Sequence, residues 1–263
     1  MSRQPQVKSC VIYPKPNPHA RLRLFCFPYA GGTAPIFRTW PGYLPAEVEV
    51  CAVQYPGRGT RIAEGLREHV EELMNSSYDD LQPFLDKPFA FFGHSMGALV
   101  SYEFARRLQR EQRPGPIGLF VSGCTAPHLR ATDRITYDLP EPEFIDELRR
   151  LQGTPPEVLD SKELMQLMLP IIRADFKASQ TYRYVPGPPL ECPIRAFGGL
   201  KDETVNREQV EGWSEHTSAG FRAQMLPGDH FFLNTSQPLL TRTIAQELIM
   251  QMNRNAARPN AAY

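Results

Sequence analysis

Long apolar runs are missing from this sequence. Nowhere do about 18 apolar residues follow one another, which is the length that a membrane-spanning helix needs. Residues 1–18 are polar and rich in proline, and they contain no apolar stretch of the kind that signal peptides carry. We therefore expect neither a membrane span nor secretion, and we predict a cytoplasmic protein.

An excess of charge is missing as well. The 29 lysines and arginines balance the 29 aspartates and glutamates, so the formal net charge is zero. Such a chain has no general electrostatic attraction for nucleic acid or for anionic lipid. We expect no nucleic-acid partner and no membrane partner, and any charged partner has to bind a local patch.

Cysteines are few, and their placement argues against two kinds of site. They stand singly and are odd in number, which fits neither the close pairs of a zinc site nor a disulfide framework. The sequence also holds no nucleotide-binding fingerprint and no internal repeat, and we expect neither a metal nor a cofactor. The five residues, expected to be reduced thiols, are Cys10, Cys26, Cys51, Cys124 and Cys192.

The sequence does hold a regular alternation of two patterns. Short β-rich apolar runs alternate with amphipathic stretches, which is typical of an α/β fold with a mostly parallel sheet and helices on both faces. One domain of this kind accounts for the 263 residues, of which 41% are hydrophobic and 22% charged. The expected strands are 22–27, 48–54, 89–92, 118–122, 194–197 and 221–225, and the expected helices are 70–85, 96–110, 207–216 and 239–252.

The alternation stops between residues 127 and 189, where we expect only helices, at 143–151 and 161–184. The second helix is interrupted by Pro170 and is apolar on nearly every face, too apolar for a free surface. We therefore predict a helical lid; the alternative is a pair of extra helices without a gating role. The expected organisation is a flexible segment 1–20, one domain 21–252 with the lid insertion at about 127–189, and a disordered tail 253–263.

The most informative motif is Gly-His-Ser-Met-Gly at residues 93–97, between an expected strand and an expected helix. A serine at the apex of such a turn is held exposed, and the helix N-terminus and the next amide face any oxyanion formed there. We therefore take Ser95 as the candidate nucleophile. Because the motif also fits an ordinary glycine-rich connection, the rest of the chain has to supply a base, an acid and a second oxyanion donor.

Two later turns, each directly after an expected strand, carry suitable partners. The chain order Ser95, Asp202, His230 is the order found in α/β hydrolases. His230 would take the serine proton as general base, and Asp202 would fix the imidazole tautomer. Asp229 competes for the role of the acid, but its position next to His230 in the chain counts against it.

The turn Pro-Tyr-Ala-Gly-Gly at residues 28–32 follows the first long strand, and its glycines allow backbone amides to face the site. We assign the amides of Ala30 and Met96 to the oxyanion hole, and we expect Tyr29 to contact the substrate. His94 is expected to shape the site. The other histidines stand in polar surroundings and are expected to be solvated: His19, His69, His128 and His216.

With these motifs in order, the chain resembles the type II thioesterases of polyketide and nonribosomal peptide pathways over about residues 21–252. The resemblance implies an α/β hydrolase fold and a freestanding enzyme that cleaves acyl thioesters from the phosphopantetheine arm of acyl or peptidyl carrier domains. It implies no cofactor, since the substrate carries the phosphopantetheine, and we expect a monomer. The motifs are 28–32, Tyr-Pro-Gly-Arg-Gly at 55–59, and those at 93–98, 198–202 and 228–232.

A physical argument agrees with a thioester substrate. A thiolate leaves readily, so the site needs a nucleophile and an oxyanion hole more than a strong acid for the leaving group. Leu164, Met168 and Ile171 of the lid would form an adaptable apolar pocket for the acyl group, because methionine repacks easily around different shapes.

Carrier domains are usually acidic, so exposed arginines are candidate docking charges. Arg58 and Arg61 follow a glycine turn, although a structural role for Arg58 is equally open. A second group on the expected helix 96–110 and just after it has a simpler interpretation as a solvated face. This group is Arg106, Arg107, Arg110 and Arg113.

Two other functions stay open at this point. The same fold serves esterases and acyltransferases of small molecules that need no carrier. A non-catalytic accessory subunit of a synthase is the third hypothesis, and the complete set of serine, aspartate and histidine argues against it.

Overall fold

The computed structural model describes residues 10–130 and 135–256, and a seven-stranded sheet forms the centre of this part of the chain. The strand order is β1-β3-β2-β4-β5-β6-β7. Strands β2 to β7 pair in parallel, and β1 pairs antiparallel with β3 at the edge. The strands are β1 Val11–Ile12, β2 Leu22–Phe27, β3 Val48–Val53, β4 Phe89–His94, β5 Leu119–Ser122, β6 Ile194–Gly199 and β7 Phe221–Leu226.

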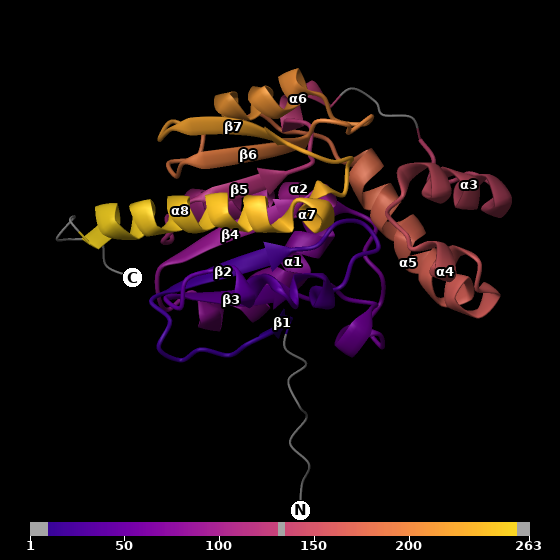
Figure 1. Cartoon of the computed structure of the whole chain (residues 1–263), viewed down its shortest axis with the longest axis horizontal. Helices are drawn as coiled ribbons and strands as arrows, with labels where there is room; N and C mark the ends of the chain where they lie inside the picture. The colour runs from indigo at the N-terminus through magenta and orange to yellow at the C-terminus, as the bar shows by residue number, and fades with distance from the viewer. Residues whose placement is uncertain (1–9, 131–134, 257–263) are drawn as a thin grey trace, which may run out of the picture.

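Helices cover both faces of the sheet (Figure 1). Such covering is expected because parallel strands need crossover connections, and these place helices on the faces. One face carries α1 (Val70–Leu81), α2 (Met96–Arg110) and α6 (Arg207–Glu211). The short α7 (Phe232–Thr235) and the long α8 (Gln237–Ala256) lie on the other. Short 3-10 helices are formed by Ala34–Phe37, Trp40–Gly42, Gly59–Arg61, Gln82–Phe84, Pro127–Leu129 and Gly212–His216.

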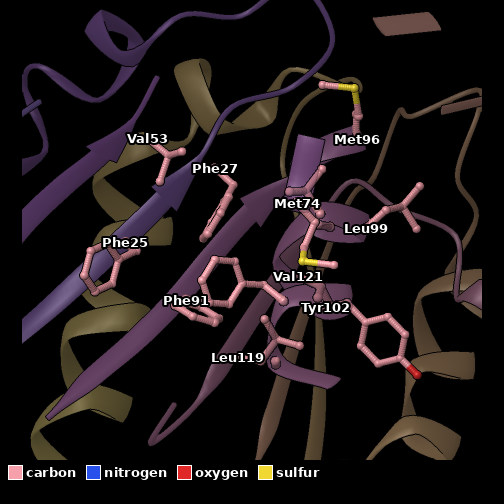
Figure 2. Packing of buried hydrophobic residues seen from close by; sticks show 14 of the residues in the cluster. Phe25, Phe27, Val53, Met74, Phe91, Met96, Leu99, Tyr102, Leu119 and Val121 are labelled. Atoms are coloured by element: carbon pink, nitrogen blue, oxygen red, sulfur yellow. The ribbon is translucent and has the colours of Figure 1, made fainter. Parts of the chain in front are cut away.

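Successive side chains of the strands point to opposite faces and so supply two cores. Phe25 and Phe91 pack edge to face, with ring centroids 6.0 Å apart, on the side of α2 (Figure 2). Cys26 and Phe92, one position further along the same strands, belong to the core under α8. Both faces are therefore dry, and every residue of β3, β4 and β5 is buried.

Three helices between β5 and β6 gather at one end of the sheet, on the right in Figure 1. They are α3 (Glu141–Leu151), α4 (Pro156–Leu159) and α5 (Lys162–Thr181), and α5 continues through Pro170. The expected interruption at this proline is therefore wrong. The helices share a small apolar core of their own, made by Phe144, Leu148, Leu159, Met165, Leu169 and Ile172.

The α/β architecture is confirmed, and all six expected strands are present. The expected helix at 96–110 has the same bounds as α2, whereas the expected helices at 70–85 and 207–216 each pass into a 3-10 turn. Among the helices in the described part of the chain, none is both long and apolar enough to cross a membrane.

The ordered structure extends further toward both termini than we expected. Residues 10–20 are not the flexible segment that we expected, because Cys10 and Ala20 are buried and Val11–Ile12 pairs with β3. The expected disordered tail begins too early, since α8 runs to residue 256. Residues 1–9 and 257–263 lie outside the described residues.

Candidate active site

Ser95 occupies the tight turn between β4 and α2, with φ 53° and ψ −119°. This is a strained conformation for a residue with a side chain, and it is typical of a nucleophile elbow. The Ser95 amide donates to the carbonyl of Ser122 at 2.8 Å, which ties the turn to β5. A Cβ atom on Gly93 would overlap the Gly97 carbonyl, and one on Gly97 would overlap the Phe27 carbonyl. Glycine is therefore required on both sides of the serine.

Asp202 and His230 form a hydrogen-bonded pair at the same edge of the sheet. His230 Nδ1 donates to Asp202 Oδ2 at 2.8 Å, and the Asp202 side chain is fully buried. Burial alone would raise the pKa of Asp202, but the hydrogen bond and charge of His230, with two hydrogen bonds from Thr204, outweigh it. The net pKa lies below its ordinary value, so the carboxylate is held ionised and orients the imidazole.

Thr204 supports this pair and was missed by the sequence analysis. Its amide and its hydroxyl donate to Asp202 Oδ1 at 2.8 and 2.7 Å, and the hydroxyl oxygen lies 3.1 Å from His230 Nδ1. The amide of Val205 donates to the same Asp202 oxygen at 3.1 Å. An aspartate that accepts from the amide two residues on is a recognisable turn, and the sequence Asp-Glu-Thr was its signal.

Asp229, the other candidate for the acid, forms a hydrogen bond with the backbone two residues further along the chain. Its Oδ1 accepts a hydrogen bond from the amide of Phe231 at 2.8 Å. The structure thus brings Asp202 to the imidazole of His230, and Asp229 stabilises the turn that presents the histidine.

Ser95 and His230 line one cavity of about 280 Å³, together with Tyr29 and Ala30. These residues follow β4, β7 and β2, and carboxyl ends of parallel strands meet at one edge of a sheet. The Tyr29 ring packs edge to face on Phe231, with centroids 5.0 Å apart. The helices of the insertion also line this cavity, with Glu147, Arg150 and Leu151 of α3 and Phe176, Ser179 and Gln180 of α5.

The expected acyl pocket of Leu164, Met168 and Ile171 is wrong. None of the three lines the cavity that holds Ser95. Leu164 is 44% exposed, and Met168 packs against the core of the three insertion helices. The residues of α5 that reach the cavity lie further along the helix, at Phe176, Ser179 and Gln180, and much of the lining that they form with α3 is polar.

Ala30, whose amide we assigned to the oxyanion hole, belongs to the 28–32 loop and lines the cavity that holds Ser95. The Gly32 amide donates to the Tyr29 carbonyl at 2.8 Å, and Gly31 has φ 76°, which a side chain disfavours. Ala30 lies inside this turn, and Met96 is the first residue of α2. Neither the Ala30 amide nor the Met96 amide donates to another described residue, so both are available as donors.

His94 lies directly behind the site. It is fully buried, its Nδ1 is 2.9 Å from Ser122 Oγ, and its ring centroid is 5.3 Å from that of His230. Burial and then the nearby His230 hold the pKa of His94 well below its ordinary value. A neutral imidazole here shapes the wall behind His230, in agreement with the expectation from the sequence.

His216, Arg58 and Arg61 lie in surroundings that differ from those we expected. His216 is buried rather than solvated, between the hydroxyl of Tyr102 at 2.8 Å and the ring of His128 at 2.9 Å. Arg58 and Arg61 are 1% and 4% exposed, so neither is a docking charge. On α2, Arg106 pairs with Glu103 and Arg107 pairs with Glu111, whereas Arg110 and Arg113 are exposed, so this group lies on a solvated face as its simpler interpretation predicted.

Comparisons with known proteins agree with this geometry. A family model described as "Thioesterase domain" matches residues 22–248. The gramicidin S biosynthesis protein GrsT of Aneurinibacillus migulanus is 42% identical over 243 residues, which cover 92% of this chain and 95% of the relative.

Two solved structures are also similar. RedJ, a thioesterase of prodiginine biosynthesis in Streptomyces coelicolor, superposes with a TM-score of 0.82 at 42% identity, over 87% of this chain and 86% of that one. The type II thioesterase BorB of the borrelidin cluster superposes with a TM-score of 0.83 at 38% identity, over 90% and 97% of the two chains. The resemblance read from the motifs is thereby confirmed, and the chain belongs to the thioesterase domain family, whose members are serine-type thioester hydrolases of the α/β hydrolase fold.

Proposed function

We propose that this chain is a freestanding type II thioesterase that hydrolyses acyl thioesters on the phosphopantetheine arms of acyl or peptidyl carrier domains. It thereby removes aberrant acyl groups from a polyketide or nonribosomal peptide synthase. The observation that carries the proposal is that His230, hydrogen-bonded to Asp202, lines the same cavity as Ser95, although three distant chain segments supply these residues. The similarity to GrsT and BorB over nearly the whole chain supports the pathway.

The first half of the reaction acylates the serine. Ser95 Oγ attacks the thioester carbonyl, and His230 takes the hydroxyl proton at Nε2 because its Nδ1 is engaged with Asp202. The carbonyl oxygen becomes an oxyanion, which the amides of Ala30 and Met96 stabilise. The carbon–sulfur bond then breaks, and the thiol of the phosphopantetheine arm leaves with the proton from His230.

The second half returns the enzyme to its starting state. Water attacks the Ser95 ester while His230 removes its proton, and the same two amides stabilise the second oxyanion. The carboxylic acid leaves as the serine recovers its proton. No cofactor or metal takes part in this scheme.

The insertion at about 127–189 acts as a lid on a single domain that includes β1 and the whole of α8 and therefore extends beyond the expected bounds of 21–252. Its helices α3 and α5 supply part of the lining of the cavity that holds Ser95, which supports a role in enclosing the acyl group. Tyr29 contacts the substrate from the other side. We propose a monomer that acts in the cytoplasm, and the buried thiols of Cys10, Cys26 and Cys51 are compatible with a reducing compartment.

The test compares one acyl group on three leaving groups. We expect kcat/KM for acetyl-loaded carrier protein to exceed the values for the acetyl thioester of a simple thiol and for an acetyl ester of a simple alcohol. Preference for the simple ester would favour a carrier-independent esterase instead. If a serine-reactive fluorophosphonate failed to label Ser95, the chain would be a non-catalytic accessory protein.

A further inference from the structure

Arg58, Asp175 and Gly31 meet in a buried junction of three segments that lie far apart in the sequence. Arg58 Nη2 donates to Asp175 Oδ1 at 2.8 Å, and Arg58 Nη1 donates to Asp175 Oδ2. The Gly31 amide donates to the same Oδ2 at 2.7 Å. The two charged side chains are 1% and 0% exposed. One carboxylate of α5 thus holds both an arginine and the backbone of the 28–32 loop.

The loop is also fixed sterically against α5. Ile172, three residues before Asp175, packs so closely under Gly31 that a Cβ atom on the glycine would lie 2.8 Å from Ile172 Cγ1. Because Asp175 and Ile172 of α5 both contact Gly31, the peptide unit that precedes Gly31 has little conformational freedom. That peptide carries the carbonyl of Ala30, the residue of this loop that lines the cavity together with Tyr29.

Arg58 is itself held in place from the other side of the loop. Its Nε donates to the carbonyl of Pro56 at 3.4 Å, and its guanidinium lies over the ring of Tyr55, 5.5 Å from the centroid. The Tyr55 hydroxyl in turn donates to the carbonyl of Pro28, at the start of the loop, at 3.5 Å. Both ends of the 28–32 loop are therefore connected to Arg58.

Stability alone does not account for this arrangement. Removing two charges from water costs several kcal/mol for each ion, and apolar side chains of similar volume often stabilise a fold as well as a buried ion pair does. A bidentate pair differs from apolar packing in its fixed geometry and in its acceptor for a backbone amide. The junction supplies both the fixed geometry and the acceptor, at a loop whose amide has to be placed to within about 1 Å for catalysis.

We propose that Arg58 and Asp175 are positioning residues that fix the 28–32 loop against α5, so that the Ala30 amide is aimed at the oxyanion formed at Ser95. The pair also connects the lid helix to the oxyanion hole, since Asp175 belongs to α5. This inference rests on the proposed function of Ser95 and Ala30.

The test uses Asp175→Asn and a matched control, Glu49→Gln. The Glu49 carboxylate also holds one arginine, Arg23, and one backbone amide, that of Asn17, but it lies near the start of β3, at the opposite edge of the sheet. Two rates are measured for each variant at a temperature where it is folded: hydrolysis of acetyl-loaded carrier protein, and labelling of Ser95 by a small fluorophosphonate. Labelling also develops an anionic oxygen at the oxyanion hole, and it needs no carrier.

For Asp175→Asn we expect kcat and the labelling rate to fall by about ten-fold or more, with KM changed by less than about two-fold, because the lost interaction acts in the transition state. Glu49→Gln is expected to lower the melting temperature and to leave both rates as in the wild type. Unchanged rates in Asp175→Asn, or equal losses in the control, would overturn the proposal.

If Asp175→Asn does not fold, the same two rates are measured for Arg58→Lys. It keeps the charge but loses the bidentate geometry, and we expect the same loss in kcat without a change in KM. Wild-type rates in a folded Arg58→Lys would overturn the proposal. Failure of the proposed function is distinguishable in the wild type, which would then either prefer the simple ester or not be labelled at Ser95.

Discussion

His230 Nδ1 lies 2.8 Å from Asp202 Oδ2, although 28 residues separate the two along the chain. The contact fixes the tautomer of the imidazole and leaves Nε2 as the base. Replacing Asp202 with asparagine is therefore expected to lower kcat by about 10²- to 10⁴-fold with little change in KM. Steady-state kinetics on acetyl-loaded carrier protein measure this loss.

Asp229→Asn is the matched control for the acid. An asparagine oxygen still accepts the amide of Phe231, so the turn is retained and kcat is expected to stay within about three-fold of wild type. If instead Asp229→Asn were the variant that lost activity and Asp202→Asn kept it, the assignment of the acid would be reversed.

The elbow glycines make a prediction about stability. A Cβ atom at Gly97 would overlap the backbone of Phe27, which cannot move without disturbing β2. We expect Gly97→Ala to lower the free energy of unfolding by several kcal/mol, measured by urea denaturation. Gly115→Ala is the control, because no atom lies within 4 Å of its added Cβ, and a change of less than about 1 kcal/mol is expected there. Equal effects of the two substitutions would contradict the tight elbow.

Some residues of this site can be predicted from short sequence motifs, whereas others depend on packing between distant parts of the chain. The turn at Ser95 and the positions of Asp202 and His230 were predicted because each depends on a short motif directly after a strand. The acyl pocket could not be predicted, because α5 is apolar on nearly every face and the sequence does not say which face meets the cavity. Packing among the insertion helices, which buries Met165 and Leu169, determines which face of α5 meets the cavity.

The buried position of Arg58 could not be predicted from the local sequence. A single arginine after a glycine turn is expected on the surface, and only its partner explains why it is buried. That partner, Asp175, lies 117 residues later on a helix of the insertion. The strand Val11–Ile12 was missed for a different reason, since two residues are too few to show an alternating pattern.

The cavity itself can be tested by filling it. Leu151 lines the cavity that holds Ser95, so Leu151→Trp is expected to reduce kcat/KM for an octanoyl group by about ten-fold more than for an acetyl group. Leu167→Trp is the control, because Leu167 is 69% exposed on α5 and is not among the residues that line this cavity. A similar shift of chain-length preference in both variants would show that the wall has been assigned to the wrong residues.

The buried His216 predicts a pH dependence of stability. Burial, followed by the charges of His128 and Arg106, lowers the pKa of His216 from 6.5 to about 4. Between these two values the unfolded chain binds a proton that the folded protein does not, so stability rises with pH. Going down from pH 6.5 toward 4, the free energy of unfolding is expected to fall by up to about 1.4 kcal/mol per pH unit from this group.

Urea denaturation at several pH values checks this slope. His216→Asn should remove its share of the slope, and His19→Asn, on the exposed surface, serves as the control. An unchanged slope in His216→Asn would mean that the histidine does not resist protonation in the folded protein.

The most direct test of the central claim, that Ser95 is the nucleophile for thioester hydrolysis, is turnover of acetyl-loaded carrier protein by Ser95→Ala. Alanine keeps the Cβ atom and removes only the hydroxyl, so the melting temperature is expected to stay close to that of the wild type. Release of acetate is then expected to fall to the rate without enzyme. Wild-type turnover by the folded variant would contradict the account.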